Sequence, residues 1–120
     1  MENYRLGEME SRFAGLIWEK APVPSGELVR LCEGEFHWKK STTYTMLKRL
    51  CERGIFQNIQ GMVTTVLSRE DFMALQSESF VEETFRGSLP EFLAAFTRRK
   101  KLSAEQVEEL QKFIDQYQEG

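Results

Sequence analysis

The sequence predicts a mainly α-helical fold with a small β-ribbon, and three observations support that prediction. Apolar residues recur at helical spacing in several segments, which are separated by proline, glycine and serine. Two short runs rich in β-branched residues flank Gly61, which is the pattern of a hairpin. Of the 120 residues, 41% are hydrophobic, which suffices for one small domain with an appended region but leaves a modest core.

The first two helices are expected in the N-terminal third of the chain. Apolar residues recur every three or four positions over residues 6–20, and Pro22 and Pro24 prevent that helix from continuing. A short second helix follows, which Ser25 is expected to cap and Gly34 to end. Its apolar side consists of Leu28, Val29, Leu31 and Cys32.

The third helix, expected over residues 41–53, has two chemically different faces. With roughly 100° between successive side chains, Thr43, Leu47 and Leu50 fall together on a face suited to a core. The opposite face carries Ser41, Thr42, Thr45, Lys48, Arg49 and Glu52. Gly54 is expected to end this helix, as a glycine after the last helical turn commonly does.

The third helix leads into the ribbon, with strands expected over residues 55–60 and 62–67 and a turn at Gln60-Gly61. Three short helices followed by a ribbon is the order of a winged helix-turn-helix unit, which we place at residues 1–68. The ribbon has no charged residue from Ile55 through Ser68. We therefore expect this wing to contribute little affinity for phosphate.

The remaining residues, 69–120, are expected to form further helices that begin at capping motifs. Ser68 and Asp71 resemble a capping box, and the helix that follows should end near Gly87. Further capping motifs begin at Ser88 and at Ser103. Between these two helices lie Arg98, Arg99, Lys100 and Lys101, which we interpret as a solvated helix end rather than a second nucleic-acid site.

Apolar side chains line these C-terminal helices, and we expect them to form a homodimer interface. The expected interface residues are Phe80, Phe85, Leu89, Phe92, Leu93, Phe96, Val107, Leu110, Phe113, Ile114 and Tyr117. The stripe on the last helix could instead pack on its own domain. A terminal helix with two aromatic residues beyond a complete winged unit favours a second copy.

The polar face of the third helix predicts contact with DNA, because short hydroxyls and arginine suit base edges and lysines suit phosphates. Residues 37–54 carry five positive charges and one negative, a local +4, whereas the whole chain carries −3. The expected DNA-binding residues are Lys39, Lys40, Ser41, Thr42, Thr45, Lys48 and Arg49. An amphipathic helix of this composition can also simply face solvent, but the concentrated charge favours a nucleic acid.

Several classes of protein are disfavoured by what the sequence lacks. His37 is the single histidine, and the sequence has neither a zinc-ligand spacing nor a glycine-rich phosphate loop. We therefore expect that the protein is not an enzyme and binds no metal ion or cofactor. No apolar run approaches the ~20 residues of a membrane span, and the N-terminus lacks signal-peptide order, so we expect a cytoplasmic protein. Cys32 and Cys51 are expected to be small core residues, with a redox role for Cys51 as the weaker alternative.

With these residues in place, the chain resembles the penicillinase-repressor family of bacterial winged-helix regulators over nearly its whole length. The most specific part is Thr42 through Leu50, which has the pattern Thr-x-x-Thr-x-x-x-Arg-Leu and is followed by Arg53-Gly54. Glu10, Trp18, Trp38, residues 80–85, Gly87-Ser88-Leu89 and Leu102-Ser103 also match. The resemblance implies a homodimer that occupies a short palindromic operator and blocks transcription, with operator DNA, a second copy and, as a further candidate, a sensor protease as partners.

Some positions depart from the family pattern. Family wings usually carry basic residues around the turn glycine, whereas this chain has Gln60 and Met62. The Asn-Phe bond that is cleaved in the β-lactam branch has its nearest counterpart in Ala95-Phe96, and the cysteine-rich C-terminal hook of the copper-responsive branch is absent. The uncharged wing and the net acidity leave a second hypothesis open, in which the winged helix is a protein–protein interaction module with weak or lost DNA binding.

Overall fold

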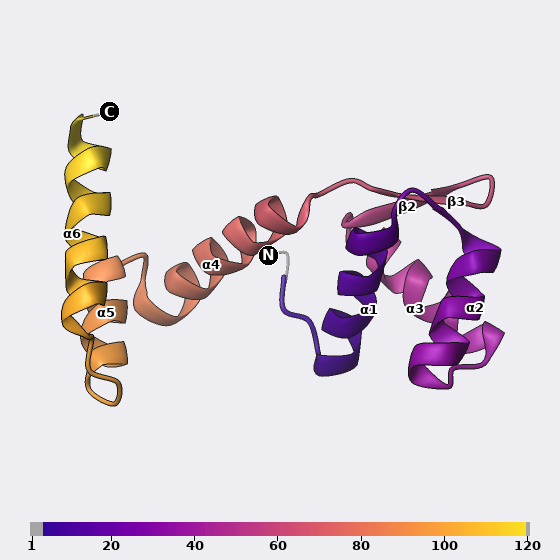
Figure 1. Cartoon of the computed structure of the whole chain (residues 1–120), viewed down its shortest axis with the longest axis horizontal. Helices are drawn as coiled ribbons and strands as arrows, with labels where there is room; N and C mark the ends of the chain where they lie inside the picture. Colours follow the sequence, from indigo (N-terminus) through magenta and orange to yellow (C-terminus); the bar gives the residue numbers. More distant parts are fainter. Residues whose placement is uncertain (1–3, 120) are drawn as a thin grey trace. The chain divides into compact units, whose positions relative to one another are not determined.

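The computed structural model describes residues 4–119, and within that range it contains six helices and three short strands (Figure 1). The elements are α1 (Glu8–Lys20), β1 (Val23–Pro24), α2 (Ser25–Phe36), α3 (Lys40–Glu52), β2 (Phe56–Ile59), β3 (Met62–Thr65), α4 (Arg69–Phe85), α5 (Leu89–Thr97) and α6 (Ala104–Glu119). This is the mainly helical, winged helix-turn-helix fold that the sequence predicts. None of the helices in the described range is long and apolar enough to cross a membrane.

The chain divides into two compact units, Met1–Ser79 and Phe80–Gly120. The sequence places a boundary after residue 68, at the start of α4, whereas the compact units divide within that helix. Phe72 explains the difference, because its side chain is buried in the first unit, with its ring 5.6 Å from that of Trp18. The first turns of α4 therefore complete the core of the winged unit.

Two expectations about α2 are wrong. Ser25 does not cap this helix: it is the first helical residue, and its hydroxyl shares a hydrogen bond of 3.1 Å with the phenol of Tyr44. Gly34 does not end the helix, which continues to Phe36 and stops where His37 adopts a left-handed conformation with φ 58°. The two extra residues bring the ring of Phe36 to 4.9 Å from that of Trp38, and this packing outweighs the low helix propensity of a single glycine.

The ribbon is confirmed, and it has an additional strand that the sequence pattern does not predict. β2 and β3 pair antiparallel on either side of Gln60 and Gly61, both of which have the positive φ that a tight hairpin turn requires. β1 adds to the other edge of β3, with Val23 opposite Val63, so the strand order is β1-β3-β2. A two-residue strand that contains Pro24 has no periodicity from which it could be predicted.

The core lies in the first unit, between α1, α2, α3 and the inner face of the sheet. Thr43, Leu47 and Leu50 are buried, as the periodicity of α3 predicts. The buried hydrophobic residues of the described range are Phe13, Ala14, Ile17, Val23, Leu28, Cys32, Leu47, Leu50, Ile55, Phe56, Val63 and Phe72. All of them belong to the first unit.

The second unit is helical but has no comparable core in the described part of a single chain. Its helices begin at the predicted caps: the Ser88 hydroxyl accepts a hydrogen bond from the Glu91 amide, and Ser103 and Gln106 exchange two bonds of 3.0 and 3.1 Å. Four phenylalanine rings contact one another edge to face or tilted, with centroids 5.6 to 6.1 Å apart: Phe80, Phe85, Phe92 and Phe96. All four rings remain partly accessible to solvent.

Candidate nucleic-acid interface

The outward face of α3 is an exposed polar surface of the first unit. All seven residues that the sequence predicts to bind DNA are exposed: Lys39, Lys40, Ser41, Thr42, Thr45, Lys48 and Arg49. Lys39 is the N-cap position of α3 and Lys40 is its first residue, so both lie at the entrance of the helix. The structure therefore leaves all seven side chains accessible at the start of α3 and along its outward side, and we call this set of residues the α3 face.

The four cations of the α3 face have no carboxylate partner. Among the salt bridges of the described residues, none includes Lys39, Lys40, Lys48 or Arg49. The guanidinium of Arg49 makes only a long contact of 3.9 Å to the sulfur of Met46. Such a contact is weak, so these charged groups remain available to an anion.

Arg53 is one of the five cations of residues 37–54, but its environment differs from that of the other four. Its guanidinium lies 3.6 Å from the carboxylate of Glu10 and donates a hydrogen bond of 2.7 Å to the carbonyl of Arg5. Glu10 also accepts a bond from the amide of Gly7, at the start of α1. Arg53 thus connects the end of α3 to the start of α1. The charged side chains of this helix that face solvent are then four cations (Lys39, Lys40, Lys48 and Arg49) and one carboxylate (Glu52), a net charge of +3.

The position of α3 depends on a junction that the sequence pattern does not reveal. Tyr44 points from α3 toward the start of α2, where its phenol meets the buried Ser25 hydroxyl at 3.1 Å. The amide of Ser25 in turn donates to the carbonyl of Gly61, in the turn of the wing, at 2.7 Å. The sequence feature that points to this junction is Tyr44, an aromatic residue that stands between Thr43 and Thr45 in α3. Ser25 therefore connects α2, α3 and the wing.

The wing presents a neutral surface. The inner face of its ribbon carries the buried Phe56 and Val63, while Ile59 and Met62 on the opposite face are 58% and 42% exposed. No cation lies on either strand. The wing therefore adds no positive charge to the α3 face.

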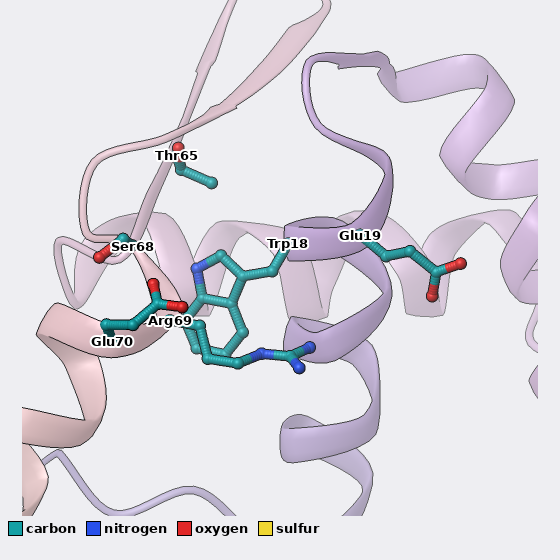
Figure 2. A pocket seen from close by; sticks show the side chains of 6 residues that line it. All are labelled: Trp18, Glu19, Thr65, Ser68, Arg69 and Glu70. Carbon is teal, nitrogen blue, oxygen red and sulfur yellow. The ribbon is translucent and has the colours of Figure 1, made fainter.

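A separate open pocket of about 430 Å³ lies where α4 begins, and it contains none of the predicted site residues (Figure 2). The guanidinium of Arg69 lies 5.5 Å from the centre of the Trp18 ring and donates to the carbonyl of Gly15, while the Trp18 indole donates to the carbonyl of Leu67. Figure 2 shows the Arg69 side chain running along the indole of Trp18, while the Glu19 side chain points away from the indole. These contacts join α4 to α1, so we interpret the pocket as a structural joint.

Both cysteines are free thiols with little tendency to ionise. Cys32 is buried in the core and Cys51 is half-buried at the end of α3. Burial raises the pKa of the Cys32 thiol, an effect that the Thr43 hydroxyl partly offsets. Burial also raises the pKa of Cys51, and the negative charge of Glu52 adds to the rise. The thiolate is the reactive form, so this environment disfavours a redox role for Cys51.

The eleven residues that the sequence assigns to a dimer interface are accessible in the single chain. Phe85, Phe92, Leu93 and Leu110 are half-buried. The remaining seven are exposed: Phe80, Leu89, Phe96, Val107, Phe113, Ile114 and Tyr117. On α6, the exposed fractions reach 64% for Phe113 and 79% for Tyr117, so the described part of the chain leaves the apolar stripe of this helix uncovered.

Comparison with known proteins adds an independent observation to this architecture. The family model described as penicillinase repressor matches residues 6–116. The penicillinase repressor of Bacillus licheniformis is 23% identical over 117 residues, which cover 94% of this chain and 91% of that protein. The methicillin resistance regulatory protein MecI of Staphylococcus aureus (strain N315) is 18% identical over 118 residues, covering 95% and 96% of the two chains. Because the family model matches most of this chain, the chain belongs to the penicillinase repressor family.

Proposed function

We propose that this protein is a transcriptional repressor that binds double-stranded operator DNA as a homodimer, with α3 in the major groove. The observation that carries the proposal is the α3 face, where four cations without carboxylate partners surround three short hydroxyl side chains. A helix with this composition suits the major groove, since it offers both phosphate ligands and groups that reach base edges. The names of two relatives, a penicillinase repressor and a methicillin resistance regulatory protein, support the same function.

Each residue of the α3 face has a role that follows from its chemistry. Arg49 can donate two parallel hydrogen bonds to O6 and N7 of a guanine, and the methyl groups of Thr42 and Thr45 can contact the C5-methyl of thymine. Ser41 can donate to or accept from either a base edge or a phosphate. The three lysines, Lys39, Lys40 and Lys48, would neutralise phosphates and fix the position of the protein without reading sequence.

The homodimer is supported by the second unit, Phe80–Gly120. The described part of this unit contains no buried hydrophobic side chain, although its helices carry a nearly continuous set of apolar residues. A helical segment of this size cannot stabilise itself without a core, and a second copy would supply one. A two-fold dimer carries two α3 helices, so its operator should be palindromic, with half-sites one or more helical turns apart.

The proposal is tested by selecting duplexes from a random DNA library with the purified protein and then measuring affinity against salt concentration. Three phosphate-binding lysines in each protomer give six in the dimer, so the slope of log K against log salt should approach about −5 if all of them meet phosphates. A footprint with two-fold symmetry should accompany this slope. Absence of any selected duplex at low salt would overturn the proposal.

The second candidate function is a protein–protein interaction module with weak or lost DNA binding. The neutral wing, with Ile59 and Met62 exposed on its outer face, is the observation that favours this alternative. It predicts a dimer in solution that shifts no duplex even at low salt. Light scattering and the DNA selection together distinguish the two functions, because only the repressor is both dimeric and bound to DNA.

A sensor protease would be a third partner of the repressor. The counterpart of the family's cleaved Asn-Phe bond is Ala95-Phe96, which lies inside α5 and has no asparagine. Cleavage at that bond would therefore require a protease with a different residue preference.

A further inference from the structure

We infer that residues 4–7, which precede α1, determine the half-site spacing that the protein accepts in its operator, because they link the end of α3 to α4. We call residues 4–7 the N-terminal segment. The inference rests on the proposed function, since it requires a homodimer with one α3 from each protomer in a major groove. It gives the segment a role in specificity, although none of its residues belongs to the α3 face.

The N-terminal segment is attached to the end of α3 by Arg53. The guanidinium of Arg53, the C-cap residue of α3, donates a hydrogen bond of 2.7 Å to the carbonyl of Arg5. It also lies 3.6 Å from the carboxylate of Glu10, which accepts a bond of 3.1 Å from the amide of Gly7. Two backbone groups of the segment are therefore held by the end of α3, one directly and one through Glu10.

The same segment is attached to α4 one residue earlier in the chain. The side-chain amide of Gln76 donates a hydrogen bond of 3.2 Å to the carbonyl of Tyr4. The ring of Tyr4 meets the ring of the buried Phe72 edge to face, with the centroids 6.1 Å apart. Because Tyr4 and Arg5 are adjacent, a short stretch of backbone connects α4 to the end of α3.

The position of Gln76 along α4 makes this connection important. The start of α4 is held by Arg69, which donates to the carbonyl of Gly15 on α1, and by the buried Phe72. Gln76 lies one helical turn beyond Phe72 and about 10 Å beyond Arg69 along the helix axis. A helix that is held only at its start can pivot, whereas an attachment further along its axis restricts its direction. The N-terminal segment therefore restricts the direction of this part of α4 relative to α3.

The direction of α4 bears on the operator because this helix joins the two compact units. It continues without a break from Arg69 in the first unit to Phe85 in the second, which we propose as the dimer unit. In a two-fold dimer, the separation of the two α3 helices then depends on how α4 is held in each protomer. One base pair added between half-sites moves them apart by about 3.4 Å and rotates them by about 34°. A stiff connection between α3 and α4 thus favours a single spacing.

The experiment compares duplexes that differ only in the spacing of their half-sites. The operator obtained by selection is remade with one base pair added or removed at its centre, and an isolated half-site is the third duplex. The wild-type protein should bind both altered spacings at least about tenfold more weakly, because its two protomers can no longer dock together. Tyr4→Ala/Gln76→Ala should lose only about two- to threefold on the same duplexes, since its α4 can change direction.

The isolated half-site separates this role from a contribution to folding. The double variant should bind the half-site as tightly as the wild type does, whereas a displaced α3 would weaken that binding too. Gln76→Ala alone keeps the contact of Tyr4 with Phe72 and should show an intermediate tolerance, so it provides the test if thermal unfolding shows that the double variant is unfolded. Met73→Ala, at a position of α4 that is 55% exposed, is the matched control and should keep the wild-type spacing preference.

The outcomes distinguish this inference from the proposed function. If the folded variants show the same spacing penalty as the wild type, or lose half-site binding, the N-terminal segment does not determine spacing. The same holds if the wild type binds all spacings equally. In each of these cases the inference is wrong and the proposed function stands, because the wild type still binds its operator. If the wild-type protein binds no duplex, the proposed function fails and the inference fails with it.

Discussion

Arg49 and Arg53 lie one helical turn apart in sequence, and the structure places them in opposite environments. Arg49 reaches solvent on the α3 face, with only a methionine sulfur beside it. Arg53 contacts Glu10 and the carbonyl of Arg5, and its side chain is only 26% exposed. Two arginines that look equivalent in a charge count therefore differ: Arg49 belongs to the proposed recognition surface, whereas Arg53 makes contacts within the fold, and each can be tested separately.

Replacing Arg49 with alanine tests its role in recognition. We expect Arg49→Ala to lower affinity for the selected operator by about 1–3 kcal/mol and to relax sequence preference at one base pair, because a bidentate contact to guanine is lost. Lys48→Ala serves as the comparison, since loss of a phosphate contact weakens binding to all duplexes alike. Competition binding against single-base operator variants provides the measurement. Unchanged sequence preference in Arg49→Ala would contradict the assigned role.

Replacing Arg53 tests its role in stability. Arg53→Ala removes a partly buried ion pair and a charge-assisted hydrogen bond to a carbonyl, so we expect the free energy of unfolding to fall by about 1–2 kcal/mol. Lys20→Ala is the control, because the Lys20–Glu19 pair is exposed on both sides and should contribute little. Urea unfolding at neutral pH gives both values. Equal stability of the two variants would show that the Arg53 contacts do not hold α3 in place.

Among the helices, three starts are capped as the local sequence predicts, whereas the start of α2 is not. The capping motifs at Ser68, Ser88 and Ser103 are local, and each serine accepts a hydrogen bond from the amide three residues later. Ser25 has the same residue type before an apolar run, yet its hydroxyl is used by Tyr44, nineteen residues away. A long-range contact thus overrides the local capping preference in α2.

The cap at the start of α6, where Ser103 and Gln106 exchange two hydrogen bonds, can be tested by mutation. We expect Ser103→Ala to lower the free energy of unfolding by about 1 kcal/mol, because the amide of Gln106 loses its acceptor at the helix start. Ser77→Ala, at an exposed position within α4, is the matched control and should be neutral or slightly stabilising. Circular dichroism during thermal unfolding measures both. A loss as large in Ser77→Ala would mean that capping is not the cause.

At the scale of the whole molecule, the two compact units differ in how they bury apolar surface. The first unit encloses a complete core, whereas the described part of the second leaves Phe113, Ile114 and Tyr117 exposed on α6. A chain with a self-sufficient winged unit and an uncovered apolar helix suits assembly through the second unit. The dimer proposed above would place this stripe in an interface.

That dimer can be tested by placing a charge in the stripe. Ile114→Asp would bury a carboxylate without a partner, so we expect the dimer dissociation constant to rise by about 100-fold or more. Gln116→Asp adds the same charge to the same helix outside the stripe and should leave the dimer intact. Sedimentation equilibrium gives the constants. If Ile114→Asp remains dimeric, the stripe of α6 is not the interface.

Local patterns predict a large part of the fold and of the candidate site. The spacing of Thr43, Leu47 and Leu50 is enough to orient α3, and that orientation also determines that Thr45 and Arg49 face outward. The β-branched runs around Gly61 likewise predict a hairpin, because only a few residues are tolerated in its turn. These features depend on side chains within one or two turns of each other. The seven α3-face residues could therefore be chosen without a structure.

The faces of α3, the turn of the wing and the caps of α4, α5 and α6 follow from local sequence, because periodicity and capping act over a few residues. The strand β1, the Ser25–Tyr44 junction and the ion pair of Arg53 with Glu10 depend on tertiary structure. Each of these joins residues nineteen or more positions apart, and their partners are chosen by packing of the whole unit rather than by local preference. Thus α3 carries its chemistry in its own residues, while its placement depends on distant parts of the chain.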